Sequence, residues 1–285
     1  MKRVLLTAVA SLVCMSGVAL PLGNPAEASI YTNGIYCGYN NLSGGFCNSF
    51  SFRLGFYGDY VFNRHLRLKE NGLDASGNGR GIQETQLNTN AGYIVFNYCD
   101  LIDIFATLGV SNLSIMTSEI SWIFNGNRLG EFFTDTTISW SFGGRISLYE
   151  WRCWTLGIEG QYFQFDPHVT QFADGARNIQ FSSHNRWKYR EWQVGAGIAY
   201  TIYVCDPKFT IVPYAGVKWS SLCLKTGHFW FISNTETFEV SDMNGAKDWG
   251  WALGATCAMC DVVGVTVEGR WADEKALHVR GQFRF

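Results

Sequence analysis

Charged residues recur at alternate positions of this chain, between apolar neighbours. Alternate side chains of a β-strand point to the same face, so each of these charges shares a face with other polar groups. On a lipid-facing surface an Arg or Lys costs about 2–4 kcal/mol at the bilayer midplane, which favours an inward position in a membrane barrel. The candidate lining of such a lumen comprises six bases and four acids: Arg53, Arg145, Lys218, Arg270, Arg280 and Arg284, with Asp59, Asp103, Glu159 and Glu268.

Rings of charge in a pore tune ion preference, so an excess of inward bases would give a weak preference for anions. The alternative is that opposite charges pair across the lumen and only rigidify the wall.

Cysteines form a second group of chemically capable residues. Cys257-Ala258-Met259-Cys260 has the C-x-x-C spacing of redox and metal pairs, but it falls at a predicted strand-to-strand turn and no second pair completes a zinc site. We therefore expect no metal site and a structural role in disulfides, within the chain or between chains. Four of the cysteines fall at predicted tight turns on one rim. The disulfide candidates are Cys37, Cys47, Cys99, Cys153, Cys205, Cys223, Cys257 and Cys260.

The sequence gives little indication of a catalytic site. The five histidines are scattered, and no Ser/His/Asp arrangement can be placed, so we predict no enzyme, no catalytic residue and no cofactor. A barrel enzyme stays an alternative that would need an acid/base cluster on one rim. Gly195-Ala196-Gly197 is a lone G-x-G inside a strand, which indicates curvature or close packing and not a phosphate loop.

The elements that would position these residues are strands. Over the last stretch, 276–285, apolar and charged residues alternate strictly, and the same pattern recurs along most of the chain. Polar, glycine-rich stretches at 69–83 and 166–185 predict long loops, while short joins such as 98–101 predict tight turns. The sequence predicts an all-β transmembrane antiparallel up-and-down barrel of about 12 strands, in a range of 10–16, with a watery lumen.

Composition agrees with that architecture. Charged residues make up 16% and mean hydropathy is −0.01, and no run of 18 apolar residues follows the N-terminus, which argues against a helical membrane protein. A soluble all-β protein is the alternative on composition alone. The formal net charge of −2 gives no reason to expect a nucleic-acid partner.

The N-terminus predicts export. Residues 1–19 have the form of a cleaved signal peptide, with Lys2 and Arg3 before an apolar run and small residues up to Ala19; cleavage after Ala28 is the weaker alternative. We expect one domain over 20–285, with an N-terminal Cys-containing segment at 20–49 and barrel strands at 50–285. The 20–49 segment is open to three interpretations: periplasmic, plug-like or a first hairpin.

Five stretches together resemble the chlamydial major outer membrane protein family of cysteine-rich porins. They run in order from end to end: Leu20–Glu27, Arg53–Phe62, Phe105–Gly109, Pro213–Ser220, and Val265–Arg270 with Asp273–Val279 and the ending Gln282–Phe285. The principal family members are longer, and their long surface loops are cut down here.

The resemblance implies a trimeric porin of the bacterial outer membrane, disulfide-linked to itself or to other cysteine-rich envelope proteins, that also strengthens the envelope. Its partners would be outer-membrane lipid and the small hydrophilic solutes and ions that diffuse through it. A non-conducting structural or adhesive barrel is the alternative that the sequence leaves open.

Overall fold

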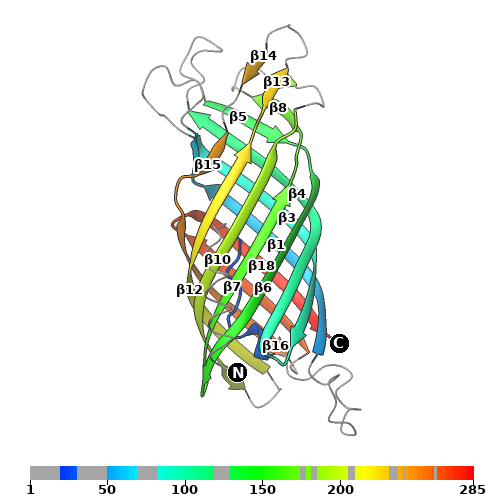
Figure 1. Cartoon of the computed structure of the whole chain (residues 1–285), viewed down its shortest axis with the longest axis vertical. Helices are drawn as coiled ribbons and strands as arrows, with labels where there is room; N and C mark the ends of the chain where they lie inside the picture. Colours follow the sequence, from blue (N-terminus) through cyan, green and yellow to red (C-terminus); the bar gives the residue numbers. More distant parts are fainter. Residues whose placement is uncertain are drawn as a thin grey trace, which may run out of the picture.

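The computed structural model describes residues 20–30, 50–69, 82–118, 129–173, 178–180, 185–204, 209–230, 237–239, 242–259 and 262–285. Their backbone forms one closed antiparallel barrel (Figure 1). Among these residues no helix is long and apolar enough to cross a membrane.

Ten strands form the ring, in the order β3-β1-β18-β17-β16-β12-β10-β7-β6-β4, and the pairing of β4 with β3 closes it. The predicted up-and-down barrel is thereby confirmed, with a count at the lower limit of the expected range. The strands are β1 (Phe50–Arg64), β3 (Ile82–Tyr98), β4 (Ile102–Ser118), β6 (Thr137–Trp151), β7 (Trp154–Phe165), β10 (Lys188–Tyr200), β12 (Phe209–Lys225), β16 (Trp249–Met259), β17 (Val263–Trp271) and β18 (Glu274–Arg284).

Eight short strands lie outside the ring order. The ring itself therefore has fewer strands than the twelve predicted from the sequence. Two of the short strands, β13 and β14, pair with each other in a separate ribbon beyond the ring. The others extend or cover the barrel ends. These eight are β2 (Leu66–Leu68), β5 (Leu129–Thr134), β8 (Val169–Ala173), β9 (Asn178–Gln180), β11 (Ile202–Val204), β13 (His228–Trp230), β14 (Thr237–Glu239) and β15 (Met243–Gly245).

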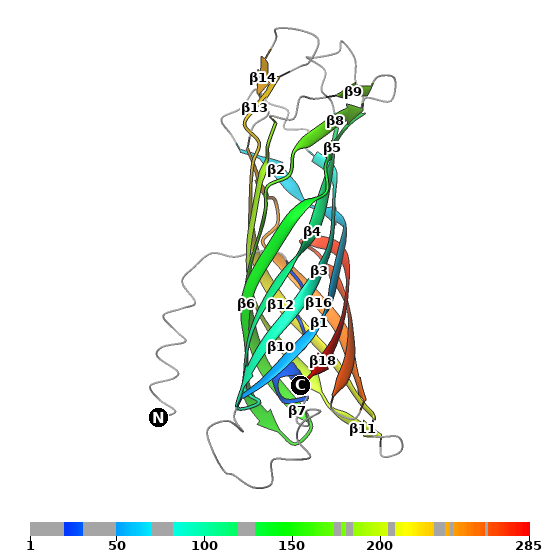
Figure 2. The same ribbon diagram turned by 90° about the vertical axis from the view of Figure 1, so that its right-hand side faces the viewer.

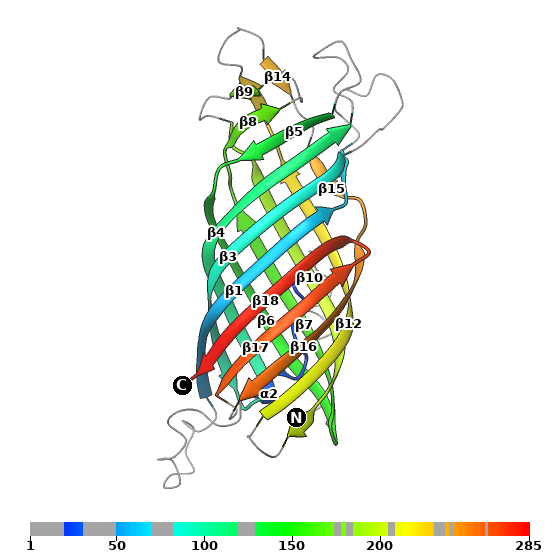
Figure 3. The ribbon, with the colours of Figure 1, turned by 180° about the vertical axis from the view of Figure 1, so that it is seen from behind.

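The two ends of the barrel differ (Figure 2). At one, here the turn end, tight turns join β3 to β4 and β6 to β7, with Cys99, Asp100 and Arg152 at positive φ. The opposite end, here the loop end, carries β5, β8, β9, β13 and β14. The first and last ring strands begin and finish at the turn end, because the ring has an even number of strands (Figure 3).

Alternation sorts the side chains of each strand into an outer and an inner face. Along β3, Ile94 and Phe96 are about half exposed, while Val95 and Asn97 between them are buried. Two outward aromatic pairs lie on β7 and its neighbour β10. Tyr162 contacts Trp192 with 4.5 Å between ring centroids, and Trp154 contacts Tyr200 with 4.7 Å, both with tilted rings. Eight residues separate them, about 27 Å of strand at roughly 3.4 Å per residue. At the tilt of about 35–45° typical of barrel strands, this length projects to about 19–22 Å along the barrel axis, compared with about 25 Å for an apolar band between aromatic girdles.

Inward side chains of the described chain are buried over most of the ring, and a hollow remains at the turn end. An apolar cluster that includes Phe132, Phe163, Trp187 and Leu224 occupies the loop end, and charged residues lie below it. Residues 20–30, here the internal segment, run inside the ring and end in the short helix α2 (Glu27–Ile30) near the turn end (Figure 3). In this conformation the inner face that was expected to line a watery lumen is closed to solvent over most of the described residues.

Leu108 tests the assignment of the outer face to lipid. It lies on β4 and is 68% exposed. We expect Leu108→Arg to lower the free energy of unfolding in lipid bilayers by up to about 2–4 kcal/mol, because an Arg would face hydrocarbon, where the cost is largest at the midplane. Tyr203→Arg is the matched control, since Tyr203 is 71% exposed on β11 at the turn end, and there the cost should be about 0–1 kcal/mol. Equal effects of the two changes in urea titrations of vesicle-inserted protein would contradict the assignment.

Candidate functional site

All ten charged residues singled out in the sequence point into the ring and are buried. Their exposed fractions run from 0% for Lys218 to 7% for Arg284. The structure gathers nine of them into two groups at different heights, and each group also holds charges that the sequence analysis did not single out. The tenth, Arg284, pairs with Asp100 at the turn end, with Nη1 3.0 Å from the carboxylate.

The first group is built on a row of residues that face one another across neighbouring strands. Asp103 of β4 lies opposite Arg145 of β6, and Arg145 lies opposite Glu159 of β7. Arg145 Nη2 is 2.5 Å from Glu159, and Arg53 Nη2 is 2.5 Å from Asp103. Opposite charges directly across a ladder stabilise the pairing of their strands. Strand register thus fixes this part of the site.

The second group lies nearer the loop end. Arg270 Nη2 is 2.7 Å from Asp59, and its Nε is 2.6 Å from Glu274. Lys218 Nζ is 3.0 Å from Asp273 and also pairs with Glu274. Asp273 lies in the turn before β18 and Glu274 at its start, where the alternating pattern breaks. The sequence analysis therefore did not include them in the candidate lining. Arg64 and Glu191 complete this group and were missed for the same reason, because both lie near strand ends.

Counted over the described residues, the buried charges balance. Seven bases and eight acids are buried inside the ring, so the excess of bases that suggested an anion preference does not hold. The bases are Arg53, Arg64, Arg145, Lys218, Arg270, Arg280 and Arg284, and the acids are Glu27, Asp59, Asp103, Glu159, Glu191, Glu268, Asp273 and Glu274.

Glu27 is the acid that no strand supplies. It lies in the internal segment, fully buried, and its carboxylate pairs with Arg145 and Arg280 and accepts a hydrogen bond from Gln282. Arg53 Nη1 donates to the Glu27 backbone carbonyl at 2.8 Å. These four partners form what we call the Glu27 cage. Removing an unpaired ion from water is costly, so a carboxylate is stable here only because of this cage.

The backbone of the internal segment is also bound by side chains of the wall. The carboxylate of Glu268 accepts hydrogen bonds from the Leu22 and Gly23 amides, both at 2.9 Å. The Gln193 side chain amide donates to the Pro21 carbonyl at 2.9 Å, and Ser147 Oγ donates to the Pro25 carbonyl at 2.9 Å. Side chains of the wall therefore satisfy a stretch that has no ladder of its own.

Further polar contacts hold the end of the segment. Asn24 Nδ2 donates to Thr256 Oγ1 at 2.9 Å and to the Val212 carbonyl at 3.2 Å. Asn97 Nδ2 donates to the Ala28 carbonyl at 3.1 Å.

Glycines on the inner face make room for the segment. A Cβ atom at Gly195 of β10 would lie 2.1 Å from Cδ1 of Leu22, and one at Gly157 of β7 would lie 3.0 Å from Cβ of Pro25. Gly197 and Gly216 also border these two side chains. The expectation that Gly195 and Gly197 permit close packing is confirmed. What they pack against is the chain's own N-terminal region.

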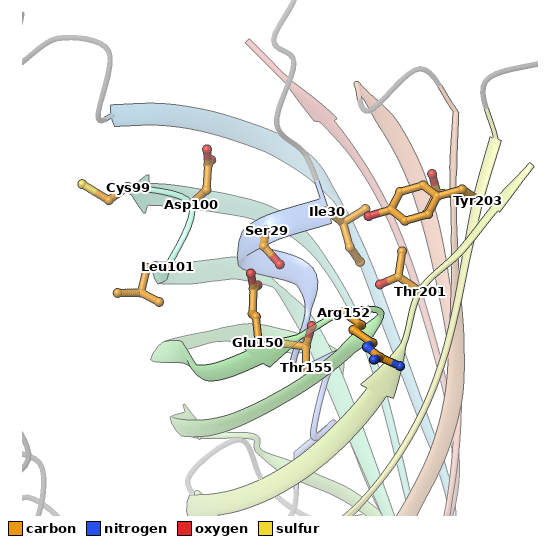
Figure 4. Close-up of a pocket in the computed structure, with 11 residues that line it drawn as sticks. Ser29, Ile30, Cys99, Asp100, Leu101, Glu150, Arg152, Thr155, Thr201 and Tyr203 are labelled. Carbon is orange, nitrogen blue, oxygen red and sulfur yellow. The ribbon is translucent and has the colours of Figure 1, made fainter. Parts of the chain in front are cut away.

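A hollow of about 490 Å³ opens at the turn end, below α2. Figure 4 shows Ser29 and Ile30 of the internal segment at its edge, together with Glu150 and Thr155. The hollow ends at the internal segment, which separates it from the rest of the interior. It is lined by Ser29, Ile30, Cys99, Asp100, Leu101, Glu150, Arg152, Thr155, Thr201, Tyr203 and Thr210.

The described cysteines are all unpaired thiols. Cys99 and Cys257 are exposed, and Cys153 and Cys223 are partly exposed. Cys99 and Cys153 lie at the turn end, as expected. The other four candidates, Cys37, Cys47, Cys205 and Cys260, lie outside the described residues. Within the described ranges no three His, Cys, Asp or Glu residues are placed to hold a metal ion.

Comparisons with known proteins agree on one family. The sequence profile described as Chlamydia major outer membrane protein matches residues 1–73, 110–187 and 225–285. A major outer membrane porin of Chlamydia pneumoniae is 28% identical, and the alignment covers all of both chains. One from Chlamydia psittaci is 29% identical over all of this chain and 99% of its own. The serovar L1 porin of Chlamydia trachomatis is 27% identical over 94% of this chain and 95% of its own.

Solved structures with a similar course of chain are outer-membrane β-barrels of other kinds. The β-domain of the Bordetella autotransporter Brka aligns with a TM-score of 0.49 at 11% identity, covering 81% of this chain and 99% of that one. The outer membrane protease OmpT of Escherichia coli aligns with a TM-score of 0.42 at 12% identity, covering 83% of this chain and 96% of that one.

Arg145 is the residue on which the charged row and the Glu27 cage both depend. We expect Arg145→Met to lower the free energy of unfolding by about 3–5 kcal/mol, because it leaves buried carboxylates without their partner. Denaturant unfolding of the refolded protein, followed by tryptophan fluorescence, measures this. Arg190→Met is the control, since Arg190 is exposed on β10, and it should change stability by less than about 0.5 kcal/mol. Similar losses for the two variants would show that the buried charges are not held by pairing.

Proposed function

The chain belongs to the Chlamydia major outer membrane protein family, and from this membership we propose that it is an outer-membrane porin through which small hydrophilic solutes and ions diffuse passively. Relatives that align over their full length are named major outer membrane porins. The proposal includes no catalytic step and no cofactor.

The observation that carries the proposal is the polar inner face of the ring. A barrel that serves only as a wall can fill its interior with apolar side chains, as this one does at its loop end. Towards the turn end, however, hydroxyl and amide groups line β4, β6 and β7, among them Thr107, Ser141 and Gln161. Such groups suit an interior that is at times filled with water. The ten charged residues predicted from the sequence are proposed as the lining of that passage.

A non-conducting structural barrel is the second candidate. The observation that favours it is the closure of the described interior, by the apolar cluster at the loop end and by the internal segment below. Under this function the ion pairs would serve only to stiffen the wall.

An envelope role is part of the proposal. Thiols at Cys99 and Cys153, on one rim of the barrel, are accessible to neighbouring subunits or to other cysteine-rich envelope proteins. Homotrimers linked in this way, embedded in outer-membrane lipid, would stiffen the envelope. The exported, oxidising location permits the disulfides.

Cleavage of the leader after Ala19 is the first part of the proposal to test. Leu20 to Ala28 make specific contacts inside the ring, which supports their retention in the mature protein. We expect mass spectrometry of the protein purified from outer membranes to find Leu20 at the N-terminus. A mature protein that starts at Ser29 would contradict this, as would one that keeps Cys14.

Conduction separates the two candidate functions. We expect the refolded mature protein to give stepwise single-channel openings in planar bilayers, at a low open fraction because the described interior is closed. The Arg145→Met variant should show altered current per opening, since it removes a charge from the proposed passage. Protein that inserts, gives a β-type circular dichroism spectrum and passes no current under reducing or oxidising conditions would favour the structural barrel.

A further inference from the structure

We propose that residues 20–30 are an autoinhibitory plug: the lumen contains a built site for this segment, and release of the segment widens the channel. The proposal rests on the porin function. It assigns to the chain's own N-terminal region the control of that passage.

The site is built from most of the ring. Side chains or carbonyls of eight of the ten ring strands hold the segment, through Arg53, Asn97, Arg145, Ser147, Gln193, Val212, Thr256, Glu268, Arg280 and Gln282. Only β4 and β7 give no such bond in the described chain, and β7 contributes Gly157 beneath Pro25. A segment without a specific site in the pore would not form hydrogen bonds with strands on every side of it.

The chemistry of the site is matched to the segment residue by residue. Glu27 is the one charged side chain of residues 20–30, and its carboxylate pairs with the guanidinium groups of Arg145 and Arg280. Gly23 has a φ of +69°, which favours glycine, and a Cβ atom there would lie 2.4 Å from Arg145 Nη2, so a larger residue would also have to move that guanidinium group. Charge and shape therefore select this segment in this register.

The ring does not need the segment for closure. The β3–β4 pairing completes the ladder, and the segment adds no strand to it. Its contacts are side-chain hydrogen bonds, ion pairs and packing, and water can replace the hydrogen bonds at a polar wall. The segment is thus a ligand of the barrel, while the backbone ladder remains intact without it.

Release of the segment would also loosen the apolar cluster that closes the loop end. Leu20 belongs to the apolar cluster at the loop end, where it is 2% exposed. When the segment leaves, that cluster loses the Leu20 side chain. The hollow at the turn end already opens to Ser29 and Ile30, so the segment can leave in that direction.

Gly195 provides a change whose closest overlap is with the segment, although the wall must also give by a few tenths of an ångström. A Cβ atom at Gly195 would overlap Leu22 Cδ1 at 2.1 Å, while the nearest atoms outside the segment, Val217 O and Lys218 Cβ, lie at 3.1 and 3.4 Å. Gly195→Val therefore displaces Leu22. Adding Leu22→Ala should restore the room and reseat the segment.

Two measurements follow these variants in the full mature protein. Hydrogen exchange of the peptide that covers residues 20–30 reports whether the segment is seated. Planar-bilayer recordings report the open fraction. We expect Gly195→Val to raise exchange of this peptide by about tenfold or more and to raise the open fraction several-fold, and we expect the Leu22→Ala second change to reverse both. Gly160→Val is the control, because a Cβ atom there meets nothing closer than 3.6 Å, and it should change neither.

A second variant covers the case in which Gly195→Val fails to fold. Glu27→Lys acts from the segment side, because it places an ammonium group against Arg145 and Arg280, and it should give the same rise in exchange and in open fraction.

The outcomes separate the two proposals. If exchange of the peptide stays at the wild-type level in both folded variants, or rises without a change in the open fraction of a wild-type protein that conducts, the plug is overturned and the porin stands. If exchange rises and no form of the protein conducts, the porin function fails, and the plug with it.

Discussion

The constraint on which the rest of this structure depends is the need to bond every backbone N–H and C=O group at membrane depth. The chain meets it by pairing β4 with β3, which closes a ring of ten strands. Eight-stranded barrels are filled by their own side chains, whereas barrels of sixteen strands or more leave an aqueous channel. A ring of ten is close to the first limit, so what points inward must fit tightly. The narrow interior follows from the strand number, and the pairing of its charges follows from the narrow interior.

Charges confined in this way cannot each keep a water shell. An unpaired buried ion costs several kcal/mol, so the interior is stable only if acids and bases are matched in place as well as in number. The wall pairs Arg145 with Asp103 and Glu159. Arg280 has Glu27 as its ion-pair partner among the described residues, so the internal segment supplies the carboxylate at that position. At the other group, Glu274 serves Lys218, Arg270 and Arg64 at once. The internal segment is therefore part of the electrostatic design of the lumen and not an accidental filling.

Sequence alone predicted what depends on a period of two. The last strand was expected from the alternation over 276–285, and β18 (Glu274–Arg284) forms there. The inward direction of the ten charges was expected for the same reason. The path of residues 20–30 was not, because a stretch with Pro21, Gly23 and Pro25 has no period, and its partners lie up to 255 residues away. The apolar filling of the loop end was also missed, since an inward Leu87 or Leu113 cannot be told from a lipid-facing one by alternation alone.

The contents of the lumen decide whether such a barrel has one state or two. An apolar core that loses a piece leaves a dry void, and the lost contacts have no replacement. The space beneath the internal segment has a different lining, with Arg145, Glu159 and Lys218 beside the gap at Gly195. Water entering that gap would find charged partners on its walls, so the segment and water compete for the same groups. A lumen built in this way has a hydrated alternative to the state in which the segment occupies it. The balance between the two states depends on a few contacts that the segment alone makes, above all the packing of Leu22 against Gly195 and the ion pair of Glu27 with Arg280.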